Sequence, residues 1–365
     1  MKLCAIIYMV INVIAHIVPQ VYLKSWCNEK NKNSIYIFDS TMLQPELRNL
    51  KTLSKTNFQK KDEYMLNIED CCLEIYSELF EELYSKINNK YYIKYKSREI
   101  RSAYEFRNYC RWMTLENQAD WIIEDLSTNL RKKYRVFLQE IISIWNLLFR
   151  EKIEKFFSEQ YENQWPNFLQ YLDNIKVSGI TRKISMSEEN RVFLIEYFGI
   201  QLTRKYGNFS MFKNIISYYS TLVGIETELD DIIVKKLWLS SIYKFMLYKK
   251  SKDERYSNNV VNLMIKLLNS KQITFELLIS DTIYFFTSDN PIFRFESNNW
   301  NDIDYIYFPI SKTLCLRISS EISDNKMLLV KKITKTEVKI INNLIKENSE
   351  KHFVCYDMNF QDYII

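Results

Sequence analysis

The chain has only four glycines among its 365 residues, and this scarcity narrows the folds and ligand sites that are open to it. The glycines are spread along the chain, at Gly179, Gly199, Gly207 and Gly224. Loops that cradle a pyrophosphate need clustered glycines, because the main chain must approach the phosphates closely. The spacing here therefore excludes a GxGxxG dinucleotide site and a P-loop. Only two histidines are present, His16 and His352, so a zinc site built on several histidines is also excluded.

The charge and the cysteine content of the chain set weaker limits on its partners and on its location. The chain has 50 Lys and Arg against 45 Asp and Glu, and its net charge of +5 neither requires nor excludes a nucleic-acid partner. The seven cysteines are odd in number and form no CxxC motif, which is not typical of a disulfide framework. Reduced, mostly buried thiols are the simplest interpretation, and they favour a cytoplasmic location.

Residues 1–15 form an apolar N-terminal extension that has two interpretations. Residues 3–15 contain one strongly polar side chain, Asn12, and have the shape of a signal peptide, which would make the protein secreted. Alternatively the start is extended or misassigned and the product is cytoplasmic, which is the interpretation we favour. The apolar stretch is too short to span a bilayer as a helix, so we expect no transmembrane segment.

Residues 16–365 predict a single α+β domain, because no linker composition interrupts them. The periodicity of apolar residues predicts a mainly helical middle packed with a C-terminal antiparallel sheet. The expected helices are 20–26, 66–86, 115–157 with one or two breaks, a helix from the capping box at 185–188 to about 206, 232–250, 259–268, and a helix from the capping box at 334–337 to about 350. The expected strands are 35–38, 282–287, 293–296, 305–309, 313–318, 327–331 and 353–356.

Several motifs, in order along the chain, resemble those of a known family. They are HIVPQVYLK at 16–24, TSDNP at 287–291, IYFPIS at 306–311, and a helical segment at 198–204 that lacks the family's usual Thr-Pro. On these motifs the chain resembles the microbial family catalogued as domain of unknown function 4238, with ordered matches from His16 to Tyr356. The resemblance implies one fold over this span and no established reaction.

His16 and Asp289 are the candidate catalytic residues. His16 is either a general base or a single metal ligand, or else a core histidine bonded to backbone. Asp289 follows an expected strand, where its carboxylate either accepts a proton or binds Mg²⁺, or else caps the turn before Pro291. A divalent metal is the cofactor class that these residues would suit, and the sequence defines no ligand set for it.

Four further residues are candidates for binding a substrate. The amides of Gln20, Gln201 and Asn290 offer both donors and acceptors, and Arg204 has the planar fork that suits a phosphate or carboxylate. Each of them also has a purely structural interpretation, as a polar group bonded within the fold. Together with His16 and Asp289, they form one polar pocket only if the fold brings their distant segments together.

Three carboxylates are spaced so that they share one face of the expected helix 115–157. Glu116, Asp120 and Glu124 follow each other at intervals of four residues. They either add metal ligands to the pocket or form a solvated face, and we favour the solvated face.

Two functions from different classes are compatible with these residues. One is an intracellular enzyme with a polar pocket that acts on a phosphorylated or nucleic-acid substrate, as a nuclease-like effector in microbial conflict. The alternative is a non-catalytic ligand- or partner-binding module whose motif residues are structural. The sequence defines neither a specific partner nor an oligomeric state.

Overall fold

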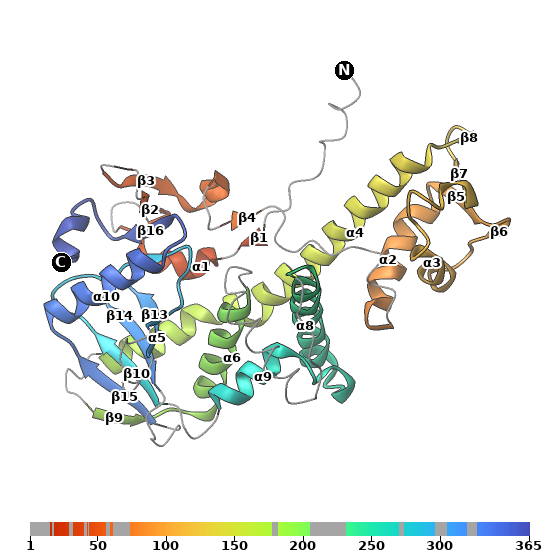
Figure 1. Ribbon diagram of the computed structural model, residues 1–365. Coiled ribbons are helices and arrows are strands. Elements are labelled where there is room, and N and C mark those ends of the chain that lie inside the picture. Colours follow the sequence, from red (N-terminus) through yellow and green to blue (C-terminus); the bar gives the residue numbers. More distant parts are fainter. Residues whose placement is uncertain are drawn as a thin grey trace.

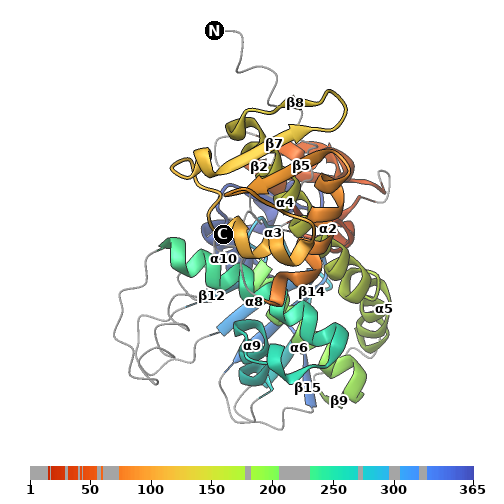
Figure 2. The ribbon, with the colours of Figure 1, turned by 90° about the vertical axis from the view of Figure 1, so that its right-hand side faces the viewer.

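The computed structural model describes residues 15–16, 18–28, 32–39, 42, 44–55, 59–60, 74–176, 182–204, 231–269, 274–295, 305–319 and 327–365. The molecule is elongated: two sheets lie at one end, helices fill the middle, and a small lobe lies at the far end of the long helix α4 (Tyr134–Phe157) (Figures 1 and 2). This mixture of helices and mainly antiparallel strands confirms the predicted α+β class.

The larger sheet has six strands in the order β12-β13-β14-β10-β15-β9. Neighbouring strands are antiparallel except β10 and β15, which are parallel. The strands are β9 (Arg182–Ser185), β10 (Thr274–Ile279), β12 (Phe293–Phe295), β13 (Tyr305–Ser311), β14 (Leu314–Ser319) and β15 (Met327–Lys332). The prediction missed β10, whose six residues are all buried, because such a run lacks the alternation of a half-exposed strand.

The second sheet joins the two ends of the sequence, in the strand order β11-β16-β2-β3. Its strands are β2 (Ser34–Asp39), β3 (Glu46–Asn49), β11 (Thr287–Ser288) and β16 (His352–Cys355). The register sets His352 opposite Asp39. The strand predicted at 282–287 therefore forms only at its end, as the short β11.

Helices cover both faces of the larger sheet. On one face Leu277 and Leu316 share a core with Trp165 and Tyr197, and on the other Leu278 shares a second core with α10. The helices of the middle and the C-terminus are α1 (Gln20–Leu23) with its 3-10 extension η1 (Lys24–Trp26), α5 (Trp165–Lys176), α6 (Glu188–Arg204), α8 (Asp231–Ser251), α9 (Val260–Leu268) and α10 (Lys335–Asn348). All of these match predicted helices except α5, which follows the predicted 115–157 helix. The capping box predicted at 185–188 is wrong, because Ser185 ends β9 and the hydroxyl of Ser187 accepts from the N–H of Asn190 at the start of α6.

The lobe beyond α4 corrects the prediction of one long helix over 115–157. Its elements are η4 (Glu74–Tyr76), α2 (Ser77–Asn88), α3 (Ala103–Cys110) and η5 (Gln118–Asp120), with a sheet of β5 (Tyr91–Tyr95), β6 (Arg98–Glu99), β7 (Trp121–Asp125) and β8 (Leu130–Arg131). The aromatic and β-branched residues at 121–123 form a strand, and only α4 is helical. The expectation that Glu116, Asp120 and Glu124 share a helix face is therefore wrong.

The N-terminal extension lies almost wholly outside the described residues, since the description begins with β1 (Ala15–His16). That strand pairs with β4 (Gln59–Lys60), and 3-10 residues Leu50–Lys55 (η2) precede β4. In the part of the chain that the structure describes, no helix has both the length and the apolar character needed to cross a membrane. The prediction of a single domain over 16–365 stays a prediction.

Candidate functional site

Tyr22, from the first motif, is buried where α1 meets the larger sheet. Its hydroxyl donates to the carbonyl oxygen of Pro309 at 2.5 Å and lies 2.7 Å from Thr287 Oγ1. Since the phenol has one proton, Thr287 is the donor in the second hydrogen bond. Burial raises the pKa of Tyr22 well above its ordinary value, so the phenol stays neutral. Tyr22 thereby connects the first motif to the second and the third.

An aromatic cluster connects the fourth motif segment to the same place. The Tyr22 ring stacks on Phe308 at 5.4 Å and lies 6.0 Å from Trp165, which in turn stacks on Tyr197 at 4.3 Å. Gln201 is buried one helical turn after Tyr197 on α6. We call the set Tyr22, Trp165, Tyr197, Thr287 and Pro309 the motif junction. Phe198, in the helical motif 198–204, lies 5.9 Å from Phe308 of the third motif, so the fold brings segments of all four motifs together.

Three predicted residues near the motif junction have different outcomes. Gln20 begins α1 and is partly buried. His16 lies in β1 opposite Gln59, and Arg204 ends α6, but the side chains of both lie outside the described residues. The catalytic role of His16 and the substrate contact of Arg204 therefore stay predictions.

Asp289 is fully buried, and its carboxylate accepts three backbone hydrogen bonds. Oδ1 accepts from the N–H of Glu350 at 2.9 Å, and Oδ2 accepts from those of Lys351 and His352, both at 3.0 Å. The N–H of Asp289 in turn donates to the carbonyl oxygen of His352. These bonds fix the segment that connects α10 to β16. They also occupy most of the carboxylate lone pairs that a proton or a cation would use.

Asn290 continues this turn. Its N–H donates to Ser288 Oγ, and its Nδ2 donates to the carbonyl oxygen of Asn348 at the end of α10. Its Oδ1 is buried and accepts no hydrogen bond from any residue that the structure describes. The amide therefore has one acceptor left for another group, which agrees with the predicted binding role without testing it.

His352, for which the sequence predicted no role, lies between two buried carboxylates. Its Nε2 is 3.7 Å from Asp39 Oδ2, and its Nδ1 is 3.9 Å from Asp289 Oδ2. Desolvation on burial lowers the pKa of His352, and the two carboxylates oppose that shift. His352 meets Asp39 because the register of β16 and β2 sets the two residues opposite each other. No local pattern in the sequence predicts this contact.

Asn342 on α10 has the same anchoring role as Asp289. Its Oδ1 accepts from the N–H of Phe286, and its Nδ2 donates to the carbonyl oxygens of Tyr284 and Tyr363. One buried amide thus joins two segments, one around residues 284–286 and one at Tyr363, to α10.

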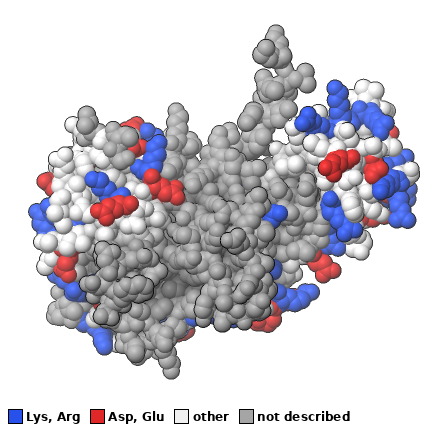
Figure 3. Space-filling view, in the orientation of Figure 1, with Lys and Arg blue, Asp and Glu red and all other residues white. Residues whose placement is uncertain are grey.

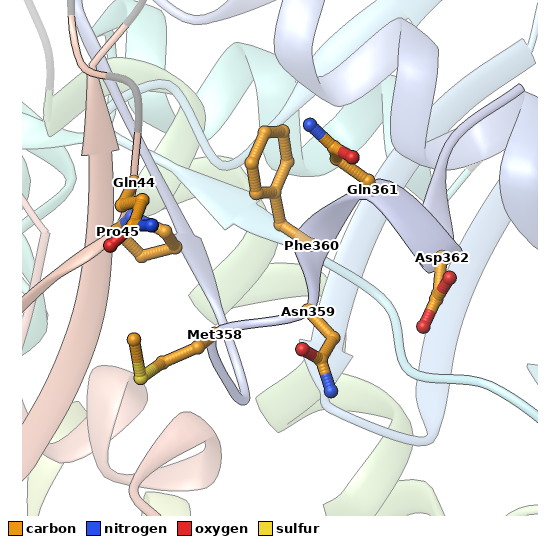
Figure 4. Close-up of a pocket in the computed structure, with 7 residues that line it drawn as sticks. All are labelled: Gln44, Pro45, Met358, Asn359, Phe360, Gln361 and Asp362. Carbon is orange, nitrogen blue, oxygen red and sulfur yellow. The ribbon is translucent and has the colours of Figure 1, made fainter.

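Within the described ranges, no three His, Cys, Asp or Glu side chains are grouped so that they would hold a metal ion. A shallow cavity of about 310 Å³ lies elsewhere, where Gln44 and Pro45 face residues 358–362 (Figure 4). Its lining is mostly polar and includes the amides of Asn359 and Gln361. None of the predicted site residues lines it.

The contacts above define a class of α+β protein in which a short N-terminal helix is fixed to two sheets by a buried tyrosine. The chain belongs to the family described as Protein of unknown function (DUF4238), whose model matches residues 15–357. No curated protein and no solved structure matches the chain. The matched range includes the motif junction, the Asp289 turn and the whole lobe beyond α4.

Proposed function

We propose that this protein is a non-catalytic binding protein in which the hallmark residues of the family stabilise the fold. The observation that carries the proposal is the carboxylate of Asp289, which accepts hydrogen bonds from three consecutive backbone amides. A general base needs an accessible lone pair within reach of its substrate. Asp289 is instead fully buried and bonded to its own chain, as expected of a structural cap.

Other motif residues support the same role. The hydroxyl of Tyr22 is buried in two hydrogen bonds, and the side chain of Asn342 satisfies three backbone groups. Buried polar groups with complete hydrogen bonding specify a fold, because each one is costly to leave unpaired. We also propose that the protein acts in the cytoplasm, an inference supported by the buried free thiols of Cys110, Cys315 and Cys355.

The test is Asp289→Ala, with Asp281→Ala as the matched surface control. We expect Asp289→Ala to lower the free energy of unfolding by about 3 kcal/mol or more, because three buried amides lose a charged acceptor. Asp281 is half-exposed and pairs with Lys332, so its substitution should change stability by less than about 1 kcal/mol. Urea denaturation of the purified variants measures both.

The same preparations are assayed for hydrolysis of phosphate esters, RNA and DNA with Mg²⁺ or Mn²⁺. We expect no turnover by the wild-type protein. Turnover that disappears in an Asp289→Ala variant of unchanged stability would show that the carboxylate is catalytic and would overturn the proposal.

A second candidate is the nuclease-like effector, and one observation favours it. The indole N–H of Trp165 is buried in the motif junction and donates to no residue that the structure describes. A buried donor without a partner costs free energy, and ligand pockets are a common place for one. In this function Gln20, Gln201 and Arg204 bind the phosphorylated substrate, and Gln201→Ala abolishes turnover without unfolding the protein.

A further inference from the structure

Helix α3, in the lobe beyond α4, presents exposed aromatic rings beside arginines. Tyr104 is 65% exposed and Trp112, just after the helix, is 44% exposed. The guanidinium of Arg107 lies 5.1 Å from the centre of the Tyr104 ring, and that of Arg111 lies 5.2 Å from the Trp112 ring. We call Tyr104, Arg107, Arg111 and Trp112 the α3 stripe. Tyr104 and Arg107 lie within α3, and Arg111 and Trp112 lie in the turn that follows it.

The arginines of the α3 stripe form no ion pair with any carboxylate that the structure describes, whereas neighbouring acids are engaged elsewhere. Glu99 pairs with Arg101 at 2.6 Å, and Asp120 lies 3.6 Å from Lys96. The carboxylate of Glu105 accepts a hydrogen bond from the backbone N–H of Arg101. The positive charge of Arg107 and Arg111 is therefore available to an anionic partner.

The segment around the α3 stripe adds to this positive charge. Residues 89–133, between α2 and α4, contain ten Lys and Arg against six Asp and Glu. Residues 74–88 of the same lobe contain four Glu and one Lys, so the excess of basic side chains is confined to the segment that carries α3. Figure 3 shows basic side chains on the lobe, at the right of the view, with acidic side chains among them. The carbonyl oxygen of Trp112 accepts a hydrogen bond from Trp121 Nε1, which fixes the backbone under the exposed ring.

We propose that the α3 stripe binds single-stranded nucleic acid. Unpaired bases stack on exposed aromatic rings, and arginine adds cation–π contacts to bases and charge-assisted hydrogen bonds to phosphates. A duplex buries its base faces, so it cannot use Tyr104 and Trp112 in this way. The inference gives the partner class for the binding function proposed above and rests on that function.

The test measures binding of the full chain to a labelled single-stranded oligonucleotide of about 12 nucleotides, a length within the usual site size. Tyr104→Ala/Trp112→Ala should weaken binding by about tenfold or more, because two stacking platforms are removed. Arg107→Gln/Arg111→Gln should weaken binding and lower the slope of log K against log salt by about 0.7 for each phosphate that the arginines no longer neutralise. Fluorescence anisotropy at several salt concentrations gives both quantities.

The matched control is Lys335→Gln/Lys346→Gln, which removes two positive charges from exposed positions on α10, at the opposite end of the molecule. It should leave the affinity unchanged within about twofold if the α3 stripe is the site. Equal weakening in control and stripe variants would indicate unspecific attraction and overturn the inference. Equal affinity for duplex and single strand would also overturn it, since stacking would then play no part.

Two further outcomes separate this inference from the proposed function. Absence of oligonucleotide binding by the wild-type protein at low salt overturns the inference and leaves a binding protein with another partner. In that case, co-sedimentation with anionic phospholipid vesicles would identify the α3 stripe as a membrane contact. Binding followed by cleavage of the oligonucleotide overturns the non-catalytic function, while loss of that binding in the Tyr104→Ala/Trp112→Ala variant still supports the stripe.

Discussion

Among single residues, His352 couples the charge of the protein to its stability. It is buried between Asp39 and Asp289, and desolvation holds its pKa below the ordinary value of 6.5. The native state therefore keeps the imidazole neutral under conditions in which the unfolded chain takes up a proton. The contribution of the neutral His352 to the stability of the folded state is complete above pH 6.5. It is lost as the pH falls toward the lowered pKa of His352 in the folded state.

We therefore expect the melting temperature of the wild-type protein to fall as the pH decreases below 6.5, the ordinary histidine value. His352→Gln should flatten the profile in this window, because the titrating group is gone. The only other histidine in the chain is His16, so His16→Gln is the natural control. Parallel profiles for wild type and His352→Gln would contradict this account.

The predicted site residues show what a local pattern can reveal. One interpretation of Asp289 was a cap of its own turn before Pro291, but its carboxylate accepts from the N–H groups of residues 350–352, and Ser288 Oγ makes the hydrogen bond within the turn. The partners of Asp289 at 350–352 lie about 60 residues further along the chain, where no spacing rule reaches. The anchoring of Tyr22 to Pro309 was hidden for the same reason, since the two residues are 287 positions apart.

At the level of elements, the scarcity of glycine is visible in the hairpin between β5 and β6. Its two turn residues, Lys96 and Ser97, have φ values of 45° and 66°, a region that favours glycine. A non-glycine residue there costs about 1–2 kcal/mol. The chain accepts this cost at the tip of the lobe, where the Lys96 side chain pairs with Asp120.

Ser97→Gly should therefore raise the free energy of unfolding by about 1 kcal/mol, with part of the gain offset by the entropy of glycine in the unfolded chain. The control is Ser102→Gly in the same lobe, where φ is −144° and the side chain caps α3. That change should lower stability by a few tenths of a kcal/mol. Urea denaturation compares the two, and a Ser97→Gly variant that loses stability would refute the strain argument.

Helices were the more predictable elements, and the reason is physical. A helix such as α10 carries its own period and cap within the segment, and the predicted capping box of Thr334 and Glu337 is present. Strand β10 instead takes its partners from β14 and β15, both later in the chain. The lobe strands β7 and β8 were missed because their apolar residues merge with those of α4 into one apparently helical run, and β5 and β6 lie between the predicted helices 66–86 and 115–157, where no element was predicted.

For the whole molecule, one hydrophobic core runs from the lobe to the larger sheet. It includes Phe106 and Trp121 in the lobe, Ile141 and Trp145 on α4, and Leu316 in the sheet. Such continuity is what the predicted single domain requires, and cooperative unfolding of the whole core would test that prediction.

Ile141→Ala, at a fully buried position of α4, tests this cooperativity. We expect a loss of about 2–5 kcal/mol from the cavity that it leaves. Hydrogen exchange of peptides from α3 and from β14 should then accelerate to the same extent, because both open only with the whole core. Acceleration confined to α3 would show that the lobe unfolds separately and that the single-domain prediction is wrong.

The hydrogen bond between Tyr22 and Thr287 also has a consequence for folding during synthesis of the chain. The two residues are 265 positions apart, so α1 leaves the ribosome long before its binding surface exists. At about 5–20 residues per second, roughly 15–50 s pass between them. During that time the apolar side chains of Val18, Leu23 and Trp26, all buried in the finished fold, have no native partners from the C-terminal sheets. A nascent chain that stops anywhere before β11 therefore exposes these apolar side chains near its N-terminus. Chaperones that recognise apolar segments would bind the chain at this position.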